Sequence, residues 1–314
     1  MRSPGAAFRA LIASAGTGKV RKPVQLLGAV NPYCALMAQK SGAPALYLSG
    51  SGVATASYGL PDLGITSLDN VVTDAARITS VTKLPLLVDI DTGFGAAFNI
   101  ARTIREMERA GVAAVHMEDQ EAAKRCGHRP GKQIVSTEEM CDRIKAAVDA
   151  RTDPGFVIMA RTDSLANEGL EKAVKRAKAY VAAGADMLFP EACSTLDEYK
   201  AFVAAMSPPE VKKDIPVLAN ITEFGKTTLF SVSELGSAGV SMVLYPLSAH
   251  RAMMDTRCSR TPVATHVLIL LYVLQRSVVP LMQTREELYQ MLDYYKYEDT
   301  LDRLFSSQKG PQGK

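Results

Sequence analysis

The sequence predicts an α/β fold of the (β/α)8 barrel type, and three observations lead to it. Eight short apolar runs recur along the chain without polar alternation, as is typical of strands buried on both faces. Amphipathic helical segments separate nearly all of these runs, which is the order that a parallel sheet requires. Polar residues stand at or just beyond the C-terminal ends of six of the runs. A barrel gathers such ends around one mouth, whereas the alternative, a doubly wound open sheet, spreads them along a line.

The expected strands and helices alternate from residue 25 to residue 245. The strands are Gln25–Val30, Ala45–Ser49, Leu86–Asp89, Ala113–Glu118, Val157–Arg161, Met187–Pro190, Val217–Asn220 and Met242–Tyr245. The clearest helices are Asp69–Thr79, Asn99–Ala110, Ser136–Ala150, Leu170–Ala183 and Thr195–Ala205. Ser136 and Glu139 have the spacing of a capping box at a helix start. Gly111 and Gly184 each follow a helix, where a left-handed C-cap is expected.

Length and composition indicate one large globular domain. The chain has 314 residues, 47% of them apolar and 22% charged, and we find no internal repeat or low-complexity linker. A net charge of +3 is too small to indicate a nucleic-acid partner. The longest unbroken apolar run, Val267–Leu274, is too short to cross a bilayer, so we expect no membrane partner. Five cysteines without paired spacing favour a reducing compartment, and the cytoplasm is the expected location.

Both ends of the chain have two interpretations. Residues 1–61 contain six Lys or Arg and no Asp or Glu, which is typical of a transit peptide for the mitochondrial matrix. The other interpretation is a surface helix, Ala6–Ala13, that leads into the first strand. From Arg285 onward the chain is helical in pattern and rich in Tyr. This tail is either a docking helix or a helix packed on its own barrel.

The motif VDIDTGFG at residues 88–95 places two carboxylates, Asp89 and Asp91, at a strand end. Side chains two apart on an extended chain point the same way, and hard oxygens so placed suit Mg²⁺ or Mn²⁺ with water completing the shell. The alternative is a solvated turn with a capping Asp. We expect Glu118, in the motif HMEDQ, to be a further ligand, direct or through water. For His116 in the same motif we expect a core histidine bonded to backbone.

A basic, glycine-containing loop at residues 123–132 carries Cys126. Neighbouring cations favour a thiolate and lower the pKa of a cysteine, which prepares it for acid–base chemistry. Those cations are Lys124, Arg125, His128 and Arg129. The alternative is a basic surface loop with an incidental cysteine.

Other polar groups predict an anionic substrate. Arg161 ends a strand, and its planar fork suits a carboxylate. The run Ser49–Gly50–Ser51–Gly52 offers backbone N–H groups and hydroxyls, as an anion nest does. Asn220 and Thr222 end the seventh strand. Each signal is weak by itself, and the prediction depends on their convergence at one mouth.

Taken together, KRCGHRPGK, VDIDTGFG, YLSGSGVA, GLPDLG, ARTD, FPE and NITEFG resemble the 2-methylisocitrate lyase branch of the isocitrate lyase and phosphoenolpyruvate mutase superfamily. The resemblance covers roughly residues 3–253 and 282–305. It implies a (β/α)8 barrel whose last helix is swapped between subunits, usually in a homotetramer. It also implies Mg²⁺-dependent cleavage of a small tricarboxylate, 2-methylisocitrate, into succinate and pyruvate in the methylcitrate cycle of propionate breakdown.

The resemblance also assigns roles to residues. Asp89 and Asp91 match the metal-binding pair, with Glu118 in the outer shell, and Cys126 matches the catalytic acid. Other groups near the chemistry, one of them the general base, are Tyr47, Asp62, Lys124, Arg125 and His128. Substrate-binding positions are Ser49, Gly50, Ser51, Gly127, Arg161, Glu191, Asn220, Ile221, Thr222, Arg251 and Arg285. Ser51 departs from the Gly often found there, although its N–H is still available.

Residues 254–281 form an atypical segment within the expected single domain of residues 1–314. The family has a charged amphipathic helix and a polar turn there, whereas this segment is apolar and contains Pro262. Because Pro is tolerated in a first helical turn, we expect a break near residues 257–261 and an apolar helix over roughly 263–275. A helical extension is expected over about 282–305. Alternatives to the lyase are a superfamily enzyme for isocitrate, oxaloacetate or a phosphonopyruvate-like 2-oxo acid, or a homologue that this segment impairs.

Overall fold

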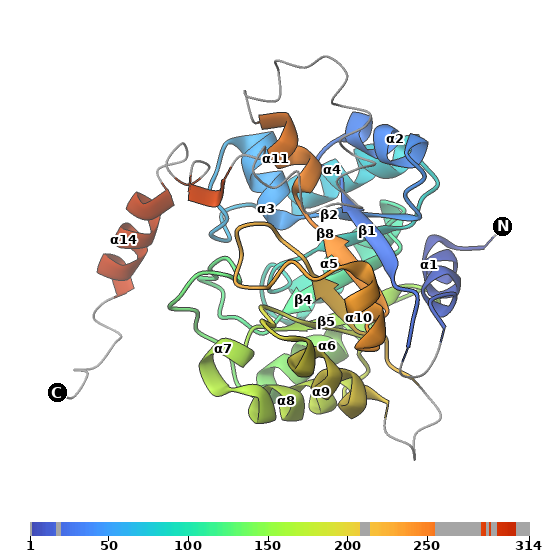
Figure 1. The fold of residues 1–314 in the computed structure, drawn as a ribbon. Helices are drawn as coiled ribbons and strands as arrows, with labels where there is room; N and C mark the ends of the chain where they lie inside the picture. The colour runs from blue at the N-terminus through green and yellow to red at the C-terminus, as the bar shows by residue number, and fades with distance from the viewer. Residues whose placement is uncertain are drawn as a thin grey trace.

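Eight parallel strands close into a barrel in the computed structural model, which describes residues 2–16, 20–207, 214–254, 284–286, 289 and 294–305 (Figure 1). The strands are β1 (Val24–Gly28), β2 (Ala45–Leu48), β3 (Leu86–Asp89), β4 (Ala114–Glu118), β5 (Val157–Thr162), β6 (Met187–Pro190), β7 (Leu218–Asn220) and β8 (Met242–Tyr245). They pair in the order β6-β5-β4-β3-β2-β1-β8-β7. The edge strands meet through a parallel bridge between Leu188 and Val217. The predicted barrel is therefore confirmed, and the open sheet was wrong.

Helices surround the barrel and alternate with its strands (Figure 1). They are α1 (Pro4–Ala13), α2 (Pro32–Lys40), α3 (Gly50–Gly52), the π-helix η1 (Val53–Ser57), α4 (Leu68–Val81), α5 (Ala97–Arg109), α6 (Thr137–Ala150), α7 (Leu165–Glu168), α8 (Leu170–Ala182), α9 (Leu196–Met206), α10 (Val232–Ser237), α11 (Ser248–Met254) and α14 (Tyr294–Phe305). Gly111 and Gly184 have φ of 75° and 113°, as expected for left-handed C-caps. At α6 the side chain of Ser136 accepts from the Glu139 N–H at 3.1 Å, but the Glu139 carboxylate pairs with Arg143 instead of completing the capping box.

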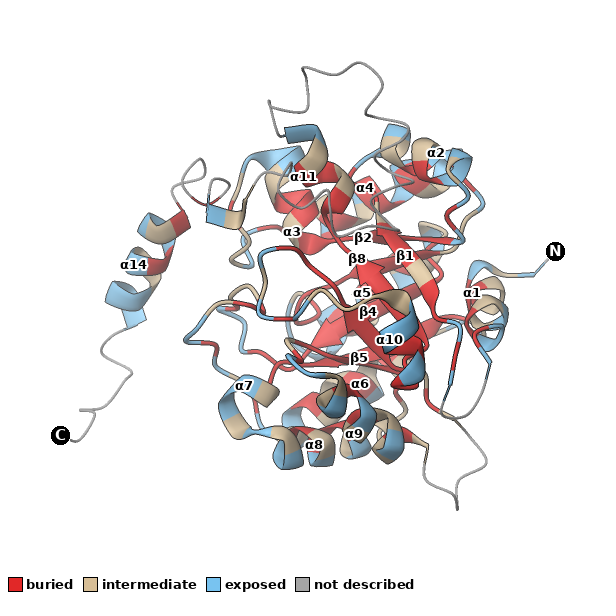
Figure 2. Ribbon diagram, viewed as in Figure 1, coloured by how far each residue is buried: buried red, intermediate tan, exposed pale blue. Residues whose placement is uncertain are grey.

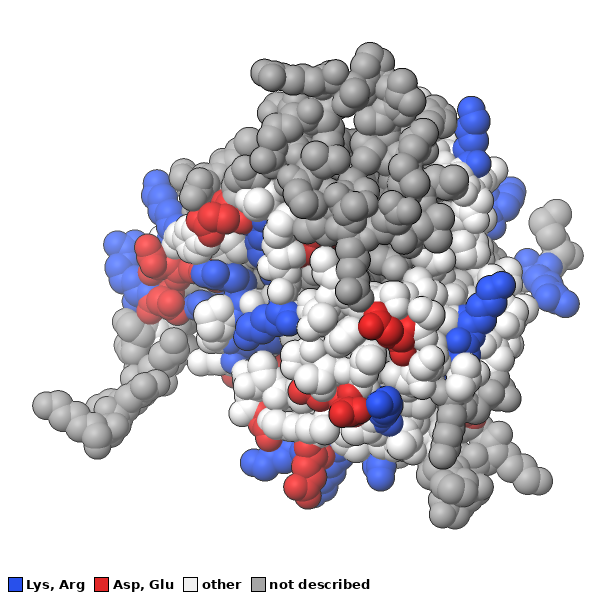
Figure 3. All heavy atoms as spheres, viewed as in Figure 1, with Lys and Arg blue, Asp and Glu red and all other residues white. Residues whose placement is uncertain are grey.

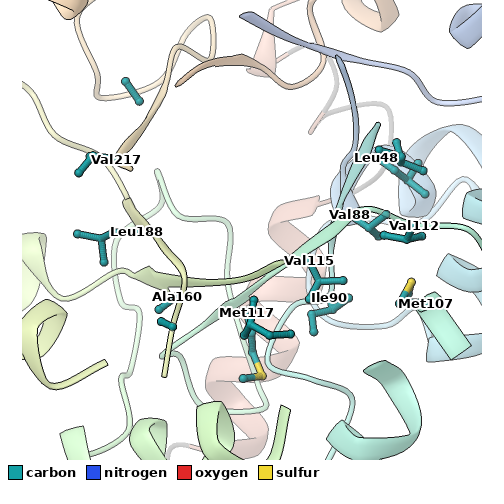
Figure 4. Close-up of a cluster of buried hydrophobic side chains, with 14 of the residues drawn as sticks. Leu48, Val88, Ile90, Met107, Val112, Val115, Met117, Ala160, Leu188 and Val217 are labelled. Carbon is teal, nitrogen blue, oxygen red and sulfur yellow. The ribbon is translucent and has the colours of Figure 1, made fainter. Parts of the chain in front are cut away.

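The strands are the most buried part of the molecule because both of their faces are covered (Figure 2). One hydrophobic cluster fills the space between the strands and the helices, and Figure 4 shows part of it, including Leu48, Val88 and Val115. A second cluster contains the alternate strand residues, among them Ala45 and Tyr47. This two-sided burial is the physical reason why the strand sequences show no polar alternation.

Helix α1 packs against the N-terminal ends of the strands, opposite the ends that carry the polar residues. Phe8 and Ile12 are buried in the second cluster. The Arg9 guanidinium donates to the carbonyls of Gly155 and Phe156 at 2.8 and 3.0 Å, just ahead of β5. The helix expected over residues 6–13 is therefore part of the fold.

The atypical segment lies outside the described residues from 255 to 283. The break expected near 257–261 and the helix expected over 263–275 therefore stay predictions, and so does the swap of a helix between subunits. Helix α14, which follows, contacts the loop after β4 of its own chain, where Arg129 pairs with Glu298 at 2.8 Å. Figure 3 shows acidic and basic side chains mixed on this side of the molecule.

Among the helices that the structure describes, none combines the length and the hydropathy needed to cross a membrane.

Candidate active site

A pocket at the C-terminal ends of the strands brings together most of the predicted site residues. Its predicted lining residues are Tyr47, Ser49, Ser51, Asp62, Asp89, Lys124, Cys126, Gly127, His128, Arg161, Glu191, Asn220, Thr222, Arg251 and Arg285. Pro246, Leu247 and Tyr289 also line it and were not predicted. Four predicted side chains do not line this pocket. Asp91 lines a neighbouring pocket, and Glu118 is buried. Ile221 packs in the hydrophobic core, and Arg125 pairs with Glu298 and Asp302 of α14.

The carboxylates of Asp89 and Asp91 converge beside the backbone of Gly50. The Gly50 N–H donates to Asp89 Oδ2 at 3.1 Å. A Cβ added to Gly50 would lie 3.1 Å from both Asp89 Oδ2 and Asp91 Oδ1, so only glycine leaves this space open. Asp91 has φ of 48°, in the left-handed region, as the chain turns directly after β3. The two acids were expected to converge because alternate side chains of an extended chain point the same way, but the turn at Asp91 is what brings them together.

Two cations act on these acids, Lys124 on both of them and Arg161 on Asp89. Lys124 Nζ lies 2.7 Å from Asp62 Oδ1 and pairs with Asp91 as well. Burial raises the pKa of Asp91 to about 6, although Lys124 opposes the change. Burial also opposes ionisation of Asp89, but His116, Lys124 and Arg161 lower its pKa below the ordinary value.

These residues fit a divalent cation. Neither carboxylate oxygen of Glu118 accepts a hydrogen bond from a described residue, and burial raises the pKa of Glu118 well above its usual range. A bound cation would remove the cost of burying such carboxylates. In the described part of the chain, no three His, Cys, Asp or Glu side chains form a complete cage. Asp89 and Asp91 would therefore supply two hard oxygens, with Glu118 behind them and water or substrate oxygens completing the shell.

The cation that faces Cys126 comes from far along the chain. Arg285 Nη1 lies 3.7 Å from Cys126 Sγ. The cations next to Cys126 in sequence are engaged by acids, since Lys124 pairs with Asp62, while Arg129 pairs with Glu298. The flanking cations were expected to act on the thiol, but they pair with acids, and Arg285 faces the sulfur in their place. No local motif indicates Arg285 as the partner, because the contact spans 159 positions.

Arg161 is held by acids that fix the direction of its fork. Its Nε donates to Asp163 Oδ2 at 2.9 Å, and its Nη2 lies 3.2 Å from Glu191 Oε2. The Asn220 amide reaches both Glu191 oxygens at 3.3 Å. Burial opposes ionisation of Glu191, but Arg161 and His128 keep its pKa well below the usual range. Glu191 is therefore an anion that orients the groups around it.

His128 has one tautomer imposed by its neighbours. Its Nδ1 accepts from the Lys226 N–H at 3.0 Å. Burial lowers the pKa of His128, so the neutral ring carries its proton on Nε2, 3.2 Å from Glu191 Oε1. The ring thus presents a proton to a carboxylate at the pocket wall.

His116 is a core histidine, as predicted, but its partner is a side chain. Its Nε2 lies 2.9 Å from the Tyr47 hydroxyl, and the two rings stack at 5.6 Å. Burial lowers the pKa of His116 to about 4, and burial also raises the pKa of Tyr47 well above its usual range. Both groups are therefore uncharged at neutral pH.

The buried His116 should make the stability of the protein depend on pH. An unfolded histidine titrates near pH 6.5, whereas in the folded chain the pKa of His116 is about 4. The unfolded state therefore binds more protons in this window, and stability falls as the pH drops through it. From pH 7 to pH 5 we expect His116 to reduce the free energy of unfolding by about 2 kcal/mol.

Urea unfolding of the wild type and of His116→Gln at both pH values measures this contribution. The variant should lose about 2 kcal/mol less than the wild type between pH 7 and pH 5. Equal losses in the two proteins would show that the pKa of His116 is not lowered on folding.

The comparisons with known proteins agree with this geometry. Residues 18–261 match the family model described as phosphoenolpyruvate phosphomutase. A 2-methylisocitrate lyase of Shewanella oneidensis is 57% identical over 308 residues, which cover 98% of this chain and 99% of the relative. An oxaloacetate acetylhydrolase, solved with the inhibitor 3,3-difluorooxalacetate, has a TM-score of 0.73 at 28% identity, covering 99% of this chain and 100% of that one. A phosphonopyruvate hydrolase, solved with oxalate and Mg²⁺, has a TM-score of 0.68 at 28% identity, covering 96% and 99%.

Proposed function

The chain belongs to the phosphoenolpyruvate phosphomutase family, and from this premise we propose that it is a carbon–carbon lyase that cleaves 2-methylisocitrate into succinate and pyruvate. The observation that carries the proposal is one pocket lined by a thiol and three arginines, with Asp89 of the converging Asp89–Asp91 pair in its wall. The chain is 57% identical to a 2-methylisocitrate lyase over its full length, but only 28% identical to the oxaloacetate acetylhydrolase. This difference supports 2-methylisocitrate as the substrate over oxaloacetate.

The charges of the pocket suit a tricarboxylate. Arg161, Arg251 and Arg285 all line it, one cation for each carboxylate of the substrate. Neighbouring groups hold two of these side chains. The Glu191 carboxylate lies beside Arg161, and the Glu223 backbone carbonyl accepts from Arg251 Nη1 at 3.2 Å. Arginine side chains that are already held in place lose little conformational entropy when the substrate binds. This favours both the affinity for the substrate and its orientation. Ser49, Ser51 and Asn220 supply further hydrogen bonds at the same wall.

The reaction is a retro-aldol cleavage in which a general base of the pocket takes the hydroxyl proton, the carbonyl of pyruvate forms and the C–C bond breaks. The electron pair of that bond moves onto the succinate fragment, where negative charge builds on a carboxylate in its aci form. A Mg²⁺ ion held by Asp89 and Asp91 would polarise substrate oxygens and stabilise that charge. Arg161, whose Nε lies 3.3 Å from Glu118 Oε2, adds a fixed positive charge.

Cys126 completes the reaction by giving its proton to the carbanionic carbon of the succinate fragment. The Arg285 guanidinium, 3.7 Å from Sγ, stabilises the thiolate that this transfer leaves behind. Tyr47 and Lys124 keep their protons at neutral pH, because the pKa of each lies well above its ordinary value. Neither group is therefore deprotonated in the resting enzyme.

The same proposal places the reaction in the methylcitrate cycle of propionate breakdown, carried out in the cytoplasm by a homotetramer. The four cysteines in the described residues, Cys34, Cys126, Cys141 and Cys193, are free thiols, which supports a reducing compartment. Sedimentation analysis of the purified chain tests the tetramer, and a monomer that is fully active would contradict it.

Product identification tests the proposed function. The purified chain is incubated with Mg²⁺ and 2-methylisocitrate, and in parallel with oxaloacetate or phosphonopyruvate. We expect succinate and pyruvate in equal amounts from the first substrate and turnover of the others at least roughly 10²-fold slower, because a site with unmatched buried charges rejects them. Faster cleavage of oxaloacetate or phosphonopyruvate would overturn the assignment.

A further inference from the structure

The loop that carries Cys126 is tied at its base by backbone bonds. Gln120, directly after β4, forms an antiparallel bridge with Ile134. The Glu121 N–H donates to the Gln133 carbonyl at 2.9 Å. In the sequence, Cys126 lies about midway between these two paired segments. Its carbonyl accepts a hydrogen bond from the Arg129 N–H at 2.8 Å. The base alone therefore does not fix the place of the thiol.

A first tie holds the residue that precedes Cys126. The fully buried Gln120 side chain accepts from the Arg125 N–H through Oε1 at 3.0 Å. Its Nε2 donates to the Arg125 carbonyl at 2.9 Å. One amide thus satisfies both backbone groups of a single residue, which fixes that residue in position and in orientation.

A second tie holds the residue that follows Cys126. Lys132 Nζ donates to the Gly127 carbonyl at 2.6 Å and to Asp163 Oδ1 at 2.7 Å. The side chains of Lys132 and Asp163 are only 1% and 0% exposed. The same Asp163 carboxylate accepts a hydrogen bond from Arg161 Nε at 2.9 Å. Lys132 therefore connects the loop beside the thiol to the acid that orients a substrate-binding arginine.

Gly127 shows how closely this tie draws the loop against the pocket wall. A Cβ at Gly127 would lie 2.4 Å from Arg161 Nη2 and 2.6 Å from Glu191 Cγ. The backbone of the loop is thus packed directly on the side chains that we assign to substrate binding. A small shift of Gly127 changes the distance between the thiol and the substrate.

We propose that Gln120 and Lys132 are positioning residues that set the place of Cys126 by fixing Arg125 and Gly127 on either side of it. The inference rests on the proposed function, because it assumes that the Cys126 thiol transfers a proton to the succinate carbon. A buried ion pair is weak evidence that a residue serves stability. The role of Lys132 therefore follows from the two groups that accept its hydrogen bonds, the Gly127 carbonyl and the Asp163 carboxylate. A displacement of about 1 Å of a reacting group costs on the order of 10²-fold in rate.

The test isolates the proton transfer from the rest of the reaction. Succinate is incubated in D2O with Mg²⁺ and enzyme, without pyruvate. The Cys126 thiolate takes one methylene proton, the resulting thiol exchanges that proton with the solvent, and a deuteron returns to the same carbon. Exchange is followed by NMR, and calorimetric titration with succinate gives the number of competent sites and the Kd.

In Lys132→Met we expect exchange per competent site to fall about 10²-fold while the Kd for succinate stays within about threefold. Arg161 still neutralises Asp163 in this variant, so the fold should persist. Lys132→Arg should recover at least about tenfold of the lost rate, because a cation returns to the two acceptors. Gln120→Leu removes the tie to Arg125, on the other side of Cys126, and should cause the same loss of exchange rate. It serves as the second variant if Lys132→Met does not fold.

A matched control removes a buried cation far from the loop. Arg21 donates to Ser241 Oγ at 2.8 Å ahead of β1, at the opposite end of the barrel. Arg21→Met should lower the unfolding temperature but leave exchange per competent site within about twofold of the wild type. Exchange in Lys132→Met or Gln120→Leu that matches this control would overturn the inference. A wild type that binds succinate without exchanging its protons would overturn the proposed role of Cys126 and the inference together.

Discussion

Replacing Asp89 or Asp91 by Ala is expected to lower kcat by roughly 10³-fold or more, because each substitution removes one of two hard oxygen ligands from the cation that stabilises the transition state. The two carboxylates meet at Gly50, and in the described part of the chain Glu118, which stands behind them, does not complete a cage of three protein ligands. Both variants should also bind Mn²⁺ more weakly, which titration calorimetry measures without any turnover.

Asp74→Ala provides the control for this prediction. Asp74 is a buried carboxylate on α4 that accepts from Ser57 at 2.5 Å and pairs with Arg77, and it does not line the pocket. This variant should lose stability and keep its Mn²⁺ affinity. Full turnover by the wild type in excess chelator would refute the assignment of the metal to this site.

Cys126→Ser is expected to fold like the wild type and to lose about 10²–10⁴-fold in kcat, the range for removal of a positioned general acid. A serine hydroxyl has nearly the same shape as a thiol but is a far weaker acid, so proton delivery to the carbanionic carbon fails. Substrate should bind almost unchanged, because Arg161 and Arg251 are not altered. Steady-state kinetics and the unfolding midpoint together check this expectation.

The matched control for the thiol is Cys141→Ser. Cys141 lies on α6 and is half-buried, as Cys126 is, but it does not line the pocket. Its replacement should leave kcat unchanged. If Cys126→Ser also turns over at a rate near that of the wild type, Cys126 is an incidental loop cysteine and the mechanism needs another acid.

Much of the fold and of the site followed from local patterns. The eight strands begin and end within two residues of their predicted bounds, since strands buried on both faces must be continuously apolar. The strand-end acids Asp89 and Glu118 were predictable because a charge that ends an apolar run needs a partner. In a barrel, all such ends share one mouth, so the individual signals converged.

Contacts between distant parts of the chain could not be predicted in this way. The cations beside Cys126 were expected to act on the thiol, but acids from α14 and from other loops engage them, and Arg285 faces the sulfur. Likewise the partner of His116 is Tyr47, on another strand, instead of backbone. Ion pairs and buried hydrogen bonds depend on which loops the fold brings together, and a single sequence does not encode that in its local spacing.

The central claim, a lyase for 2-methylisocitrate, is tested most directly by measuring Mg²⁺-dependent kcat/KM for 2-methylisocitrate and isocitrate side by side. A pocket that accepts one additional methyl group discriminates by about 10–200-fold, so we expect 2-methylisocitrate to be preferred within that range, with succinate and pyruvate as products. A higher kcat/KM for isocitrate, or no cleavage of either substrate by the folded enzyme with Mg²⁺, would contradict the claim.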